Sequence, residues 1–435
     1  MGLHRFGLPV PGRPPRLLHW QLGIATRDPV PRLFTRGIYG ILLPTKSGNE
    51  TAPDTVRRDN GRITQMERPI FQPVGTPVEE LDTPALVVDL EVMDRNIQTF
   101  QSYFKDTSVK ARPVVTSHLC PQVARRQLDA GGTNGGIAVT TLGEAEVFAA
   151  AGFPDILLAN LVVTRAKINR LCALAGQTSV GVAVDSPDNA EQLSQGAAAA
   201  GVELRVLVEI EAGMGRCGIA PGPDAVSLAQ KVNNLPGLKF QGIMGSVPGP
   251  KGEDDPDQHR AKTTANLQVV LDAKEQIEQA GLPVETVSVG GTHCYAQAVG
   301  MAGVTEVRAG RYPLMDHRLK SFLPDLEPAA KVLASVISHP MEDMAVLDAG
   351  HKAMAPDQGR PILEGVPGGT ASRFSAEHGV MELEGDARNK LNPGDKAWLV
   401  PYELGACVNQ FDYIRATKDG KLEGFWPISA RGKLA

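Results

Sequence analysis

The feature that most constrains the fold is a regular alternation of two kinds of segment between Pro77 and Gly310. Short runs rich in Val and Ile alternate with segments rich in Ala, Glu and Gln, most of which end on a Gly that favours a left-handed helix C-cap. This alternation is typical of β-α units and a parallel sheet. Eight strands are expected, at residues 111–115, 135–141, 155–160, 179–185, 203–211, 238–244, 285–291 and 305–310.

Eight strands joined by helical crossovers predict an α/β fold, a closed (β/α)8 barrel, in preference to a doubly wound open sheet, which is the alternative. A further strand is expected before them, at residues 85–90. Beyond residue 330, β-prone segments separated by Gly, Pro and Asp predict a mostly antiparallel β domain. We therefore divide the chain into an extension (1–75), a barrel (76–325) and a C-terminal β domain (326–435).

The first 65 residues differ in composition from the rest, with ten Arg and Lys against four Asp and Glu. Prolines interrupt every helical pattern in this segment, which predicts a disordered extension or a start assigned too early, with Met66 as the natural beginning. A transit peptide is the alternative. The stretches PGRPPR and DPVPR disfavour it, because they would break the amphipathic helix that such peptides form.

Charge and cysteine content exclude several classes of partner. The formal net charge of −5 provides no attraction for nucleic acid or for anionic lipid, so neither partner is expected. No apolar run approaches the ~20 residues of a membrane-spanning helix. The five cysteines are scattered, without the spacing of a zinc site, and indicate a reducing, cytoplasmic compartment. These features favour a soluble enzyme or binding protein for a small molecule.

The ends of the last two expected barrel strands carry glycine-rich loops. In a (β/α)8 barrel the functional residues lie at the C-terminal ends of the strands. Gly290, Gly291 and Thr292 follow the seventh strand, and Gly310 and Tyr312 follow the eighth. Backbone N–H groups in such loops can bind a phosphate, although glycine is equally well explained by a tight turn.

The fifth expected strand ends in EIEAGMGRCG, which places Arg216 near the barrel mouth together with Glu209 and Glu211. An arginine at this place either binds a phenolate, carboxylate or ring nitrogen of a ligand or forms an ordinary ion pair with one of the two glutamates. From the residues alone, the ion pair is the simpler interpretation.

A set of motifs in a fixed order resembles one enzyme family. The motifs are LDTPALVVDLEVMDRNI, ARPVVTSHLCPQVARRQLDAGG, TTLGEAEVFAAAGFPDILLANLVV, VEIEAGMGRCGI, VSVGGT, TEVRAGRYPLMD and DAGHKA. They are similar to those of the D-threonine aldolase and D-serine dehydratase family, from about Thr76 to the C-terminus. This family is the metal-assisted branch of the pyridoxal-phosphate enzymes that share the alanine racemase barrel. The resemblance implies that fold, a lyase activity and a homodimer.

The resemblance also locates the cofactor anchor, and here this chain departs from the family. The family holds pyridoxal phosphate through a lysine at the end of the first barrel strand, in a motif similar to Arg-Pro-His-x-Lys-Thr-His-Lys. The same register reads Arg112 to Leu119 in this sequence, with Thr116 at the place of the lysine. A threonine hydroxyl cannot form a Schiff base.

Two further family positions differ. Ser246 stands where the family has a tyrosine near the cofactor, and Glu403 and Gly405 stand where the family has two metal ligands. Glu403 could still hold a hard divalent cation such as Mg or Mn. The positions that match the family's cofactor contacts are Arg216, Gly290, Gly291, Thr292, Gly310 and Tyr312.

Three functions remain open at this point. The first is a lyase of altered mechanism that cleaves a C–C or C–O bond β to a carboxylate in a small hydroxy acid or amino acid. Its candidate catalytic residues are Thr116, His118 and His293, with Glu403 as a metal ligand, although His118 could instead cap the helix that follows. The second is a non-catalytic relative that binds pyridoxal phosphate or another phosphorylated ligand, and the third is a dimeric scaffold.

Overall fold

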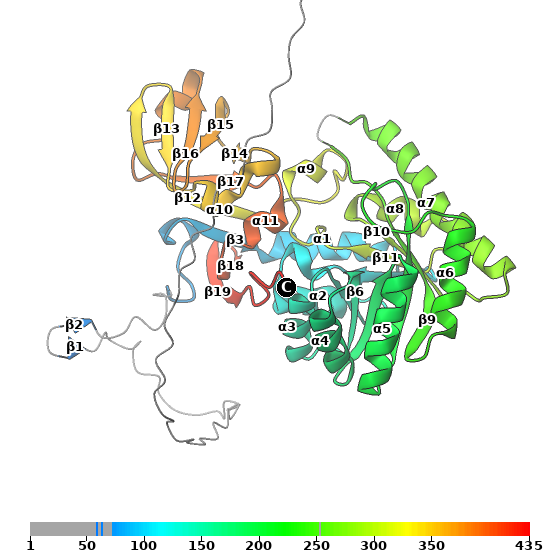
Figure 1. Ribbon diagram of the computed structural model, residues 1–435. Coiled ribbons are helices and arrows are strands. Elements are labelled where there is room, and N and C mark those ends of the chain that lie inside the picture. The colour runs from blue at the N-terminus through cyan, green and yellow to red at the C-terminus, as the bar shows by residue number, and fades with distance from the viewer. Residues whose placement is uncertain (1–57, 60–61, 64–71, 252–253) are drawn as a thin grey trace, which may run out of the picture. The chain divides into compact units, whose positions relative to one another are not determined.

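The computed structural model describes residues 58–59, 62–63, 72–251 and 254–435 (Figure 1). Contacts divide the chain into two units, Met1–Pro69 and Ile70–Ala435. In the first unit, β1 (Arg58–Asp59) and β2 (Arg62–Ile63) form an antiparallel pair. The extension expected at residues 1–75 falls almost entirely outside the described residues.

The larger unit contains a barrel of eight parallel strands in the order β4-β11-β10-β9-β8-β7-β6-β5. Bridges from Ala111 to Thr133 and from Val114 to Ala138 bring the region of β5 back to β4 and close it. The prediction of a (β/α)8 barrel is confirmed, and the open-sheet alternative is wrong. The strands are β4 (Lys110–Pro113), β5 (Ile137–Val139), β6 (Asp155–Leu161), β7 (Ser179–Val184), β8 (Leu204–Glu211), β9 (Leu238–Ser246), β10 (Thr286–Gly290) and β11 (Glu306–Ala309).

Helices cover the outside of the barrel, and Figure 1 shows α3, α4 and α5 side by side along the strands. They begin at the residues that the sequence marks as N-caps. Thr141 and Glu144 form a complete capping box at the start of α3, and the Ser186 side chain caps α5. The helices are α1 (Leu90–Ser102), α2 (Pro121–Asp129), α3 (Leu142–Ala150), α4 (Arg165–Ala175), α5 (Pro187–Ala200), α6 (Pro223–Asn234), α7 (Pro256–Gln279) and α8 (Tyr295–Val299).

A polar layer crosses the barrel near the N-terminal ends of its strands. The Arg112 Nε donates to Glu306 Oε2 at 2.7 Å, and the Ser288 hydroxyl donates to Glu306 Oε1 at 2.6 Å. Arg112 also pairs with Asp155 on β6 at 3.2 Å. Because these groups are buried or partly buried, their mutual contacts are needed to offset the loss of hydration. This layer joins β4, β6, β10 and β11 at the end of the barrel opposite the expected site.

The second sheet has nine strands in the order β15-β16-β13-β12-β3-β18-β19, with β17 paired to β12 and β14. All its pairs are antiparallel except that of β3 with β18, which confirms the mostly antiparallel second domain. Its strands are β3 (Ala85–Asp89), β12 (Ala330–Met341), β13 (Met344–Leu347), β14 (Ile362–Glu364), β15 (Gly369–Phe374), β16 (Gly379–Leu383), β17 (Lys396–Val400), β18 (Tyr413–Lys418) and β19 (Lys421–Pro427). The opening strand β3 thus lies in this sheet, between β12 and β18, although its residues fall within the range 76–325 expected for the barrel.

Short helices follow strands of both sheets, and α11 of the second domain lies against η2 at the barrel mouth. They are η2 (Val115–Ser117) after β4, η3 (Thr292–Cys294) after β10, α9 (His317–Lys320) after β11, α10 (His351–Met354) and α11 (Leu404–Val408) after β17. One apolar cluster runs through both domains, with members such as Val123, Val289, Ala334 and Leu404. The residues of the mouth therefore rest on a continuous core.

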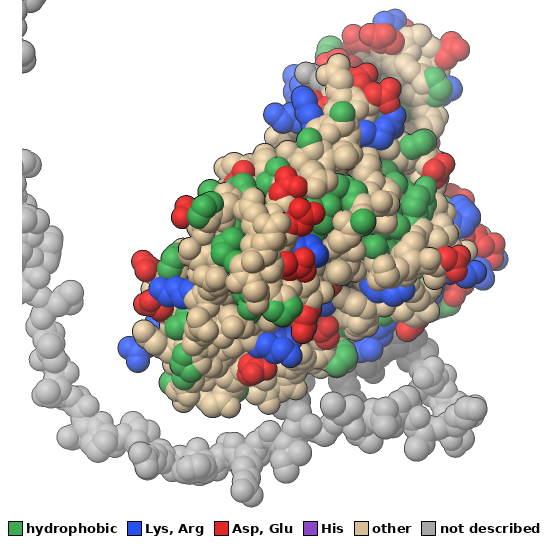
Figure 2. Space-filling model, turned by 90° about the vertical axis from the view of Figure 1, so that its right-hand side faces the viewer, with side chains coloured by type: hydrophobic (Ala, Val, Ile, Leu, Met, Phe, Trp, Pro, Cys, Tyr) green, Lys and Arg blue, Asp and Glu red, His purple; other side chains and the backbone are tan. Residues whose placement is uncertain are grey.

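The surface agrees with the balanced composition. Acidic and basic side chains are interspersed over the face drawn in Figure 2, rather than gathered by sign. Within the described residues, no helix is both long enough and apolar enough to cross a bilayer.

Candidate active site

Thr116 lies at the mouth of the barrel in η2, where it contacts a buried carboxylate. Its hydroxyl donates to Glu144 Oε2 at 2.9 Å and lies 3.2 Å from the Thr140 hydroxyl. Glu144 also accepts the backbone N–H of Thr140 at 2.8 Å. Burial raises the pKa of the Glu144 carboxyl, and these hydrogen bonds act in the opposite direction. The residue at the expected anchor position is thus the hydrogen-bond partner of a carboxylate that holds protons more tightly than usual.

Glu144 was absent from the candidates that the sequence supplied, although one signal for its position exists. The segment TTLGE reads as a capping box, and the structure contains that box. The pattern alone gives no indication that the same carboxylate also receives the Thr116 hydroxyl.

His118 is fully buried and both of its ring nitrogens have protein partners. Nε2 lies 3.0 Å from Gln127 Oε1, and Nδ1 accepts the backbone N–H of Cys120 at 3.2 Å. Burial lowers the pKa of the imidazole to about 4, so the ring is neutral at pH 7. Both contacts would have to break before His118 exchanged a proton with a ligand. They fix the ring beside Cys120, the residue before α2, while the alternative that His118 caps this helix stays a prediction.

The two glycine loops follow neighbouring strands, as expected, and the N–H groups of Gly291, Gly310 and Arg311 have partners within the chain. The Thr292 hydroxyl accepts the N–H groups of Gly310 at 3.2 Å and Arg311 at 2.9 Å. Gly291 has φ of +141°, and its N–H donates to the backbone carbonyl of Arg308 at 2.8 Å. A Cβ on Gly310 would overlap the Val114 carbonyl. Glycine is therefore required here by close packing and backbone conformation.

Tyr312 follows the second loop and is fully buried. Its ring stacks on Phe100 of α1, with 3.7 Å between ring centroids. Burial raises the pKa of its phenol, so it stays protonated at ordinary pH. This position places the ring in the core between the barrel and α1.

Ser246 ends β9 and pairs in register with Gly290 on one side and Glu211 on the other. Arg216 is exposed on the loop after β8. Burial raises the pKa of the nearby Glu209 carboxyl, while the charges of Arg308 and Arg216 act in the opposite direction. These positions bring Ser246 and Gly290 together, with Arg216 on the rim beside Glu209.

Glu403 caps α11, where its Oε2 accepts the N–H of Ala406 at 2.7 Å and its Oε1 pairs with Arg311. Arg311 also pairs with the buried Asp316. A carboxylate held by a guanidinium and an N–H group is poorly placed to bind a cation. Within the part of the chain that the structure describes, no three His, Cys, Asp or Glu side chains are grouped to hold a metal.

His293 in η3 lies against the glycine loop, and a second histidine faces it. The ring of His259, on α7, is 5.5 Å from that of His293 between centroids. Burial, together with the charges of His259, Arg318 and Arg311, lowers the pKa of the His293 imidazole to about 3. Neither His259 nor Arg318 carried a sequence signal, because they belong to α7 and α9 and meet His293 only in the folded chain.

These residues do not fit a covalently held pyridoxal phosphate. Thr116 has no amine, and two lysines that could be imagined in its place, Lys110 of β4 and Lys352 of α10, are engaged elsewhere. Lys110 begins β4 at the opposite end, where its Nζ donates to the Thr107 carbonyl at 3.0 Å. Lys352 is exposed and pairs with Glu377. Cofactor and metal both remain expectations from the family.

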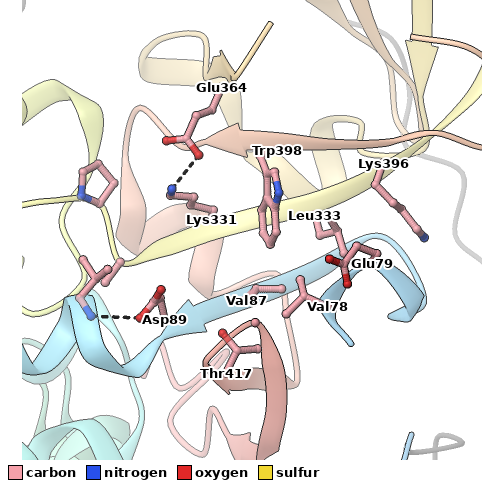
Figure 3. A pocket seen from close by; sticks show the side chains of 14 residues that line it. Val78, Glu79, Val87, Asp89, Lys331, Leu333, Glu364, Lys396, Trp398 and Thr417 are labelled. Atoms are coloured by element: carbon pink, nitrogen blue, oxygen red, sulfur yellow. Dashed lines mark hydrogen bonds and ion pairs between the residues drawn. The ribbon is translucent and has the colours of Figure 1, made fainter. Parts of the chain in front are cut away.

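A separate pocket lies on the second sheet (Figure 3). Val87, Leu333 and Trp398 form its apolar wall, and Lys331 and Glu364, which also line it, pair with each other at 2.6 Å. None of the candidate residues of the barrel mouth lines it.

Comparison with known families gives two adjacent matches. Residues 88–316 match the alanine racemase N-terminal domain, and residues 329–417 match the putative serine dehydratase domain. These ranges correspond to the barrel and to most of the second sheet.

Individual proteins are similar to this chain over most of its length. D-threonine aldolase of an Arthrobacter species is 35% identical over 373 residues, covering 84% of this chain and 96% of that protein. The 3-hydroxy-D-aspartate aldolase of Paracoccus denitrificans (strain Pd 1222) is 35% identical over 370 residues, covering 82% and 94%. The crystal structure of D-threonine aldolase from Filomicrobium marinum is 34% identical, with a TM-score of 0.80, covering 84% of this chain and all of that one. D-threo-3-hydroxyaspartate dehydratase from Delftia sp. HT23 is 29% identical, with a TM-score of 0.73, covering 81% and 98%.

Proposed function

Because this chain belongs to the D-threonine aldolase and D-serine dehydratase-like family of lyases, we propose that it cleaves a C–C or C–O bond β to a carboxylate. The substrate is a small β-hydroxy amino acid or hydroxy acid. The reaction proceeds without a protein imine at the end of β4. The observation that carries this proposal is the contact of Thr116 with Glu144, at the position where the family has its lysine.

The Thr116–Glu144 pair supplies a proton acceptor of the right kind. Burial raises the pKa of the Glu144 carboxyl, which makes it a stronger proton acceptor than an ordinary glutamate, and a hydroxyl in contact with it can relay a proton. In an aldol cleavage, the substrate β-hydroxyl gives its proton to this pair, the Cα–Cβ bond breaks, and the carbonyl forms at Cβ. The electron pair of the broken bond remains at Cα next to the carboxylate and takes up the proton that the Thr116–Glu144 pair received from the β-hydroxyl, which restores the pair.

The alternative is a non-catalytic relative that binds pyridoxal phosphate or another phosphorylated ligand. The two glycine loops on β10 and β11 favour it, because they keep Gly290, Gly291, Thr292 and Gly310 in one place. Binding of this kind needs no amine. His293 remains a proposed contributor to either function, whereas Glu403 would hold a metal only after leaving its pair with Arg311.

Incubation with pyridoxal phosphate separates the two functions. The protein is scanned for imine absorbance near ~420 nm, reduced with borohydride and mapped by mass spectrometry. In parallel, D-threonine, 3-hydroxyaspartate and simple β-hydroxy acids are assayed for cleavage, with and without divalent metal. Turnover without a labelled lysine supports the altered mechanism, whereas a labelled lysine refutes it. Binding of pyridoxal phosphate without any turnover supports the alternative.

The role of the pair itself is tested by Thr116→Val, which removes the hydroxyl but keeps the shape of the side chain. We expect a loss of turnover of about 10²-fold or more, the usual contribution of a positioned proton-transfer group. Since Glu144 also closes the capping box of α3, Thr116→Val is more informative than replacing Glu144. Thr370→Val, on the exposed face of β15, is the matched control. Equal turnover in both variants would exclude the pair from the reaction.

A further inference from the structure

The segment after β19 leaves the second sheet and returns to the mouth of the barrel. Figure 1 marks the C-terminal end beside α2 and α3. Residues 428–435, which we call the strap, begin with two buried side chains, Ile428 and Ala430, which expose 3% and 1% of their surface. The side chains of residues 431–435 are exposed. Apolar burial therefore anchors the start of the strap only.

The strap contacts the loop that carries Thr116. The Ala430 N–H donates to the Leu119 carbonyl at 3.1 Å, and the Leu119 N–H donates to the Val115 carbonyl at 2.7 Å. Leu119 has φ of +55°, in the left-handed region that residues with a Cβ rarely adopt. Such a backbone persists only where its surroundings hold it. The strap is thus part of what holds the chain directly after Thr116.

The strap also contacts the capping box of α3. The Thr141 hydroxyl has a single proton, which it donates to the Lys433 carbonyl at 2.5 Å. A lone pair of the same oxygen accepts the Glu144 N–H at 3.1 Å. Gly143 lies directly beneath the strap, where an added Cβ would lie 2.7 Å from the Ala435 backbone oxygen. The strap therefore packs on the turn that positions Glu144.

The contacts of the strap with the second domain are few. The Gly432 N–H donates to Asn409 Oδ1, at the end of α11, at 2.8 Å, and Arg431 pairs with Asp412 at 2.6 Å. The ion pair is exposed and contributes little. A segment with so few buried groups opens locally at low cost. A single substitution at Ala430 should therefore release the strap without unfolding either domain.

We propose that the strap is a positioning element that holds Glu144 in contact with Thr116. It does so by fixing the orientation of the Thr141 hydroxyl and the backbone of Leu119. This role rests on the proposed function, in which the Thr116–Glu144 pair exchanges a proton with the substrate. When the strap is released, the Thr141 hydroxyl loses its fixed orientation, and water reaches the Glu144 carboxylate.

Ala430→Asp releases the strap, because a charge at a buried position has to move into water. Ala376→Asp, at an exposed alanine between β15 and β16, is the matched control. Hydrogen exchange of the full chain, followed by mass spectrometry, measures release, and circular dichroism melting verifies that each variant is folded. Exchange at residues 428–435 should be about tenfold faster or more in Ala430→Asp and unchanged in Ala376→Asp.

Gly143→Ala displaces the strap from the side of the barrel. Its Cβ would meet the Ala435 backbone oxygen, while alanine favours the α3 helix more than glycine does. Faster exchange of the strap in a variant whose helix is not weakened assigns the effect to the strap itself.

Turnover and its pH profile connect the strap to Glu144. A displacement of ~1 Å in a reacting group can lower a rate by about 10²-fold, so Ala430→Asp should lower kcat by about ten- to hundredfold. Burial raises the pKa of Glu144, so contact with water should move the acid limb of the kcat profile to lower pH. A loss of stability alone would not move this limb.

The environment of Glu144 is also measured without turnover. Urea denaturation at pH 4.5 and pH 7 is compared with and without Glu144→Gln, which isolates the part of the pH dependence that Glu144 contributes. Because its pKa is raised by burial, this part is a loss of stability as pH rises above 4.5. The loss should be present in the wild type and in Ala376→Asp and should be much smaller in Ala430→Asp.

The proposal is overturned if the strap exchanges at the same rate in the wild type and in Ala430→Asp. It is equally overturned if release of the strap leaves the Glu144 contribution unchanged, or leaves kcat unchanged in an active enzyme. If release alters the Glu144 contribution while the wild type cleaves no hydroxy acid, the strap does position Glu144 and the lyase proposal fails.

Discussion

His118 provides the prediction whose magnitude follows most directly from the structure. Its imidazole is fully buried, and burial lowers its pKa from 6.5 to about 4. The folded chain therefore binds the His118 proton less tightly than the unfolded chain does. It follows that stability from this group is complete above pH 6.5 and is lost as the pH falls toward 4.

The size of this loss can be worked out from linkage. A tenfold change in proton affinity corresponds to about 1.4 kcal/mol, so the full effect is about 3 kcal/mol, and about 2 kcal/mol of it is lost between pH 7 and pH 5. His118→Asn removes the titration. The Asn side chain can still accept the Cys120 N–H, but the contact with Gln127 is lost, which lowers the free energy of unfolding at pH 7 by about 1–3 kcal/mol.

Urea denaturation at pH 7 and pH 5, followed by fluorescence and circular dichroism, measures the prediction. The wild type should be more stable than His118→Asn at pH 7, and this difference should shrink by about 2 kcal/mol at pH 5. The control His378→Asn, at an exposed histidine, should have nearly the same free energy of unfolding as the wild type at pH 7 and at pH 5. A difference between wild type and His118→Asn that is the same at both pH values would refute a buried neutral histidine.

Three other substitutions test the mouth of the barrel. Thr116→Lys should give imine absorbance near ~420 nm with pyridoxal phosphate and a borohydride-labelled peptide at that position, and an unchanged spectrum would mean that the loops no longer bind the cofactor. Burial raises the pKa of Glu144, so the wild type loses stability as pH rises above the ordinary value of 4.5, which is the opposite sign to the effect of His118. Glu144→Gln removes this titration, and urea denaturation of the variant should show no such loss. Gly310→Ala would push a Cβ into the Val114 carbonyl and should lower the free energy of unfolding by about 1–3 kcal/mol, whereas Gly424→Ala, with open space at its Cβ, should change it little. Thermal unfolding distinguishes the two glycine variants, and equal melting temperatures would contradict the close packing at Gly310.

The sequence by itself determined the barrel and the family. Strands and helices are encoded locally, because the spacing of apolar residues and the caps such as Thr141 and Ser186 act within a few residues. All eight barrel strands overlap the segments expected for them. The sequence alone also shows that Thr116 stands at the position of the family's lysine, because that conclusion depends only on the register within one motif.

Only the tertiary structure decided which strands pair with each other and which side chains meet at the barrel mouth. β3 joins the second sheet because its hydrogen bonds go to β12 and β18, about 250 and 330 residues further along the chain. The same holds for the contact of Glu403 with Arg311 and for the meeting of Arg318 with His293. Burial is likewise a property of the whole fold, and it is burial that keeps His118 neutral and raises the proton affinity of Glu144. The sequence specifies the type of each residue. The desolvation and the charged neighbours that shift its pKa arise only when distant segments pack together.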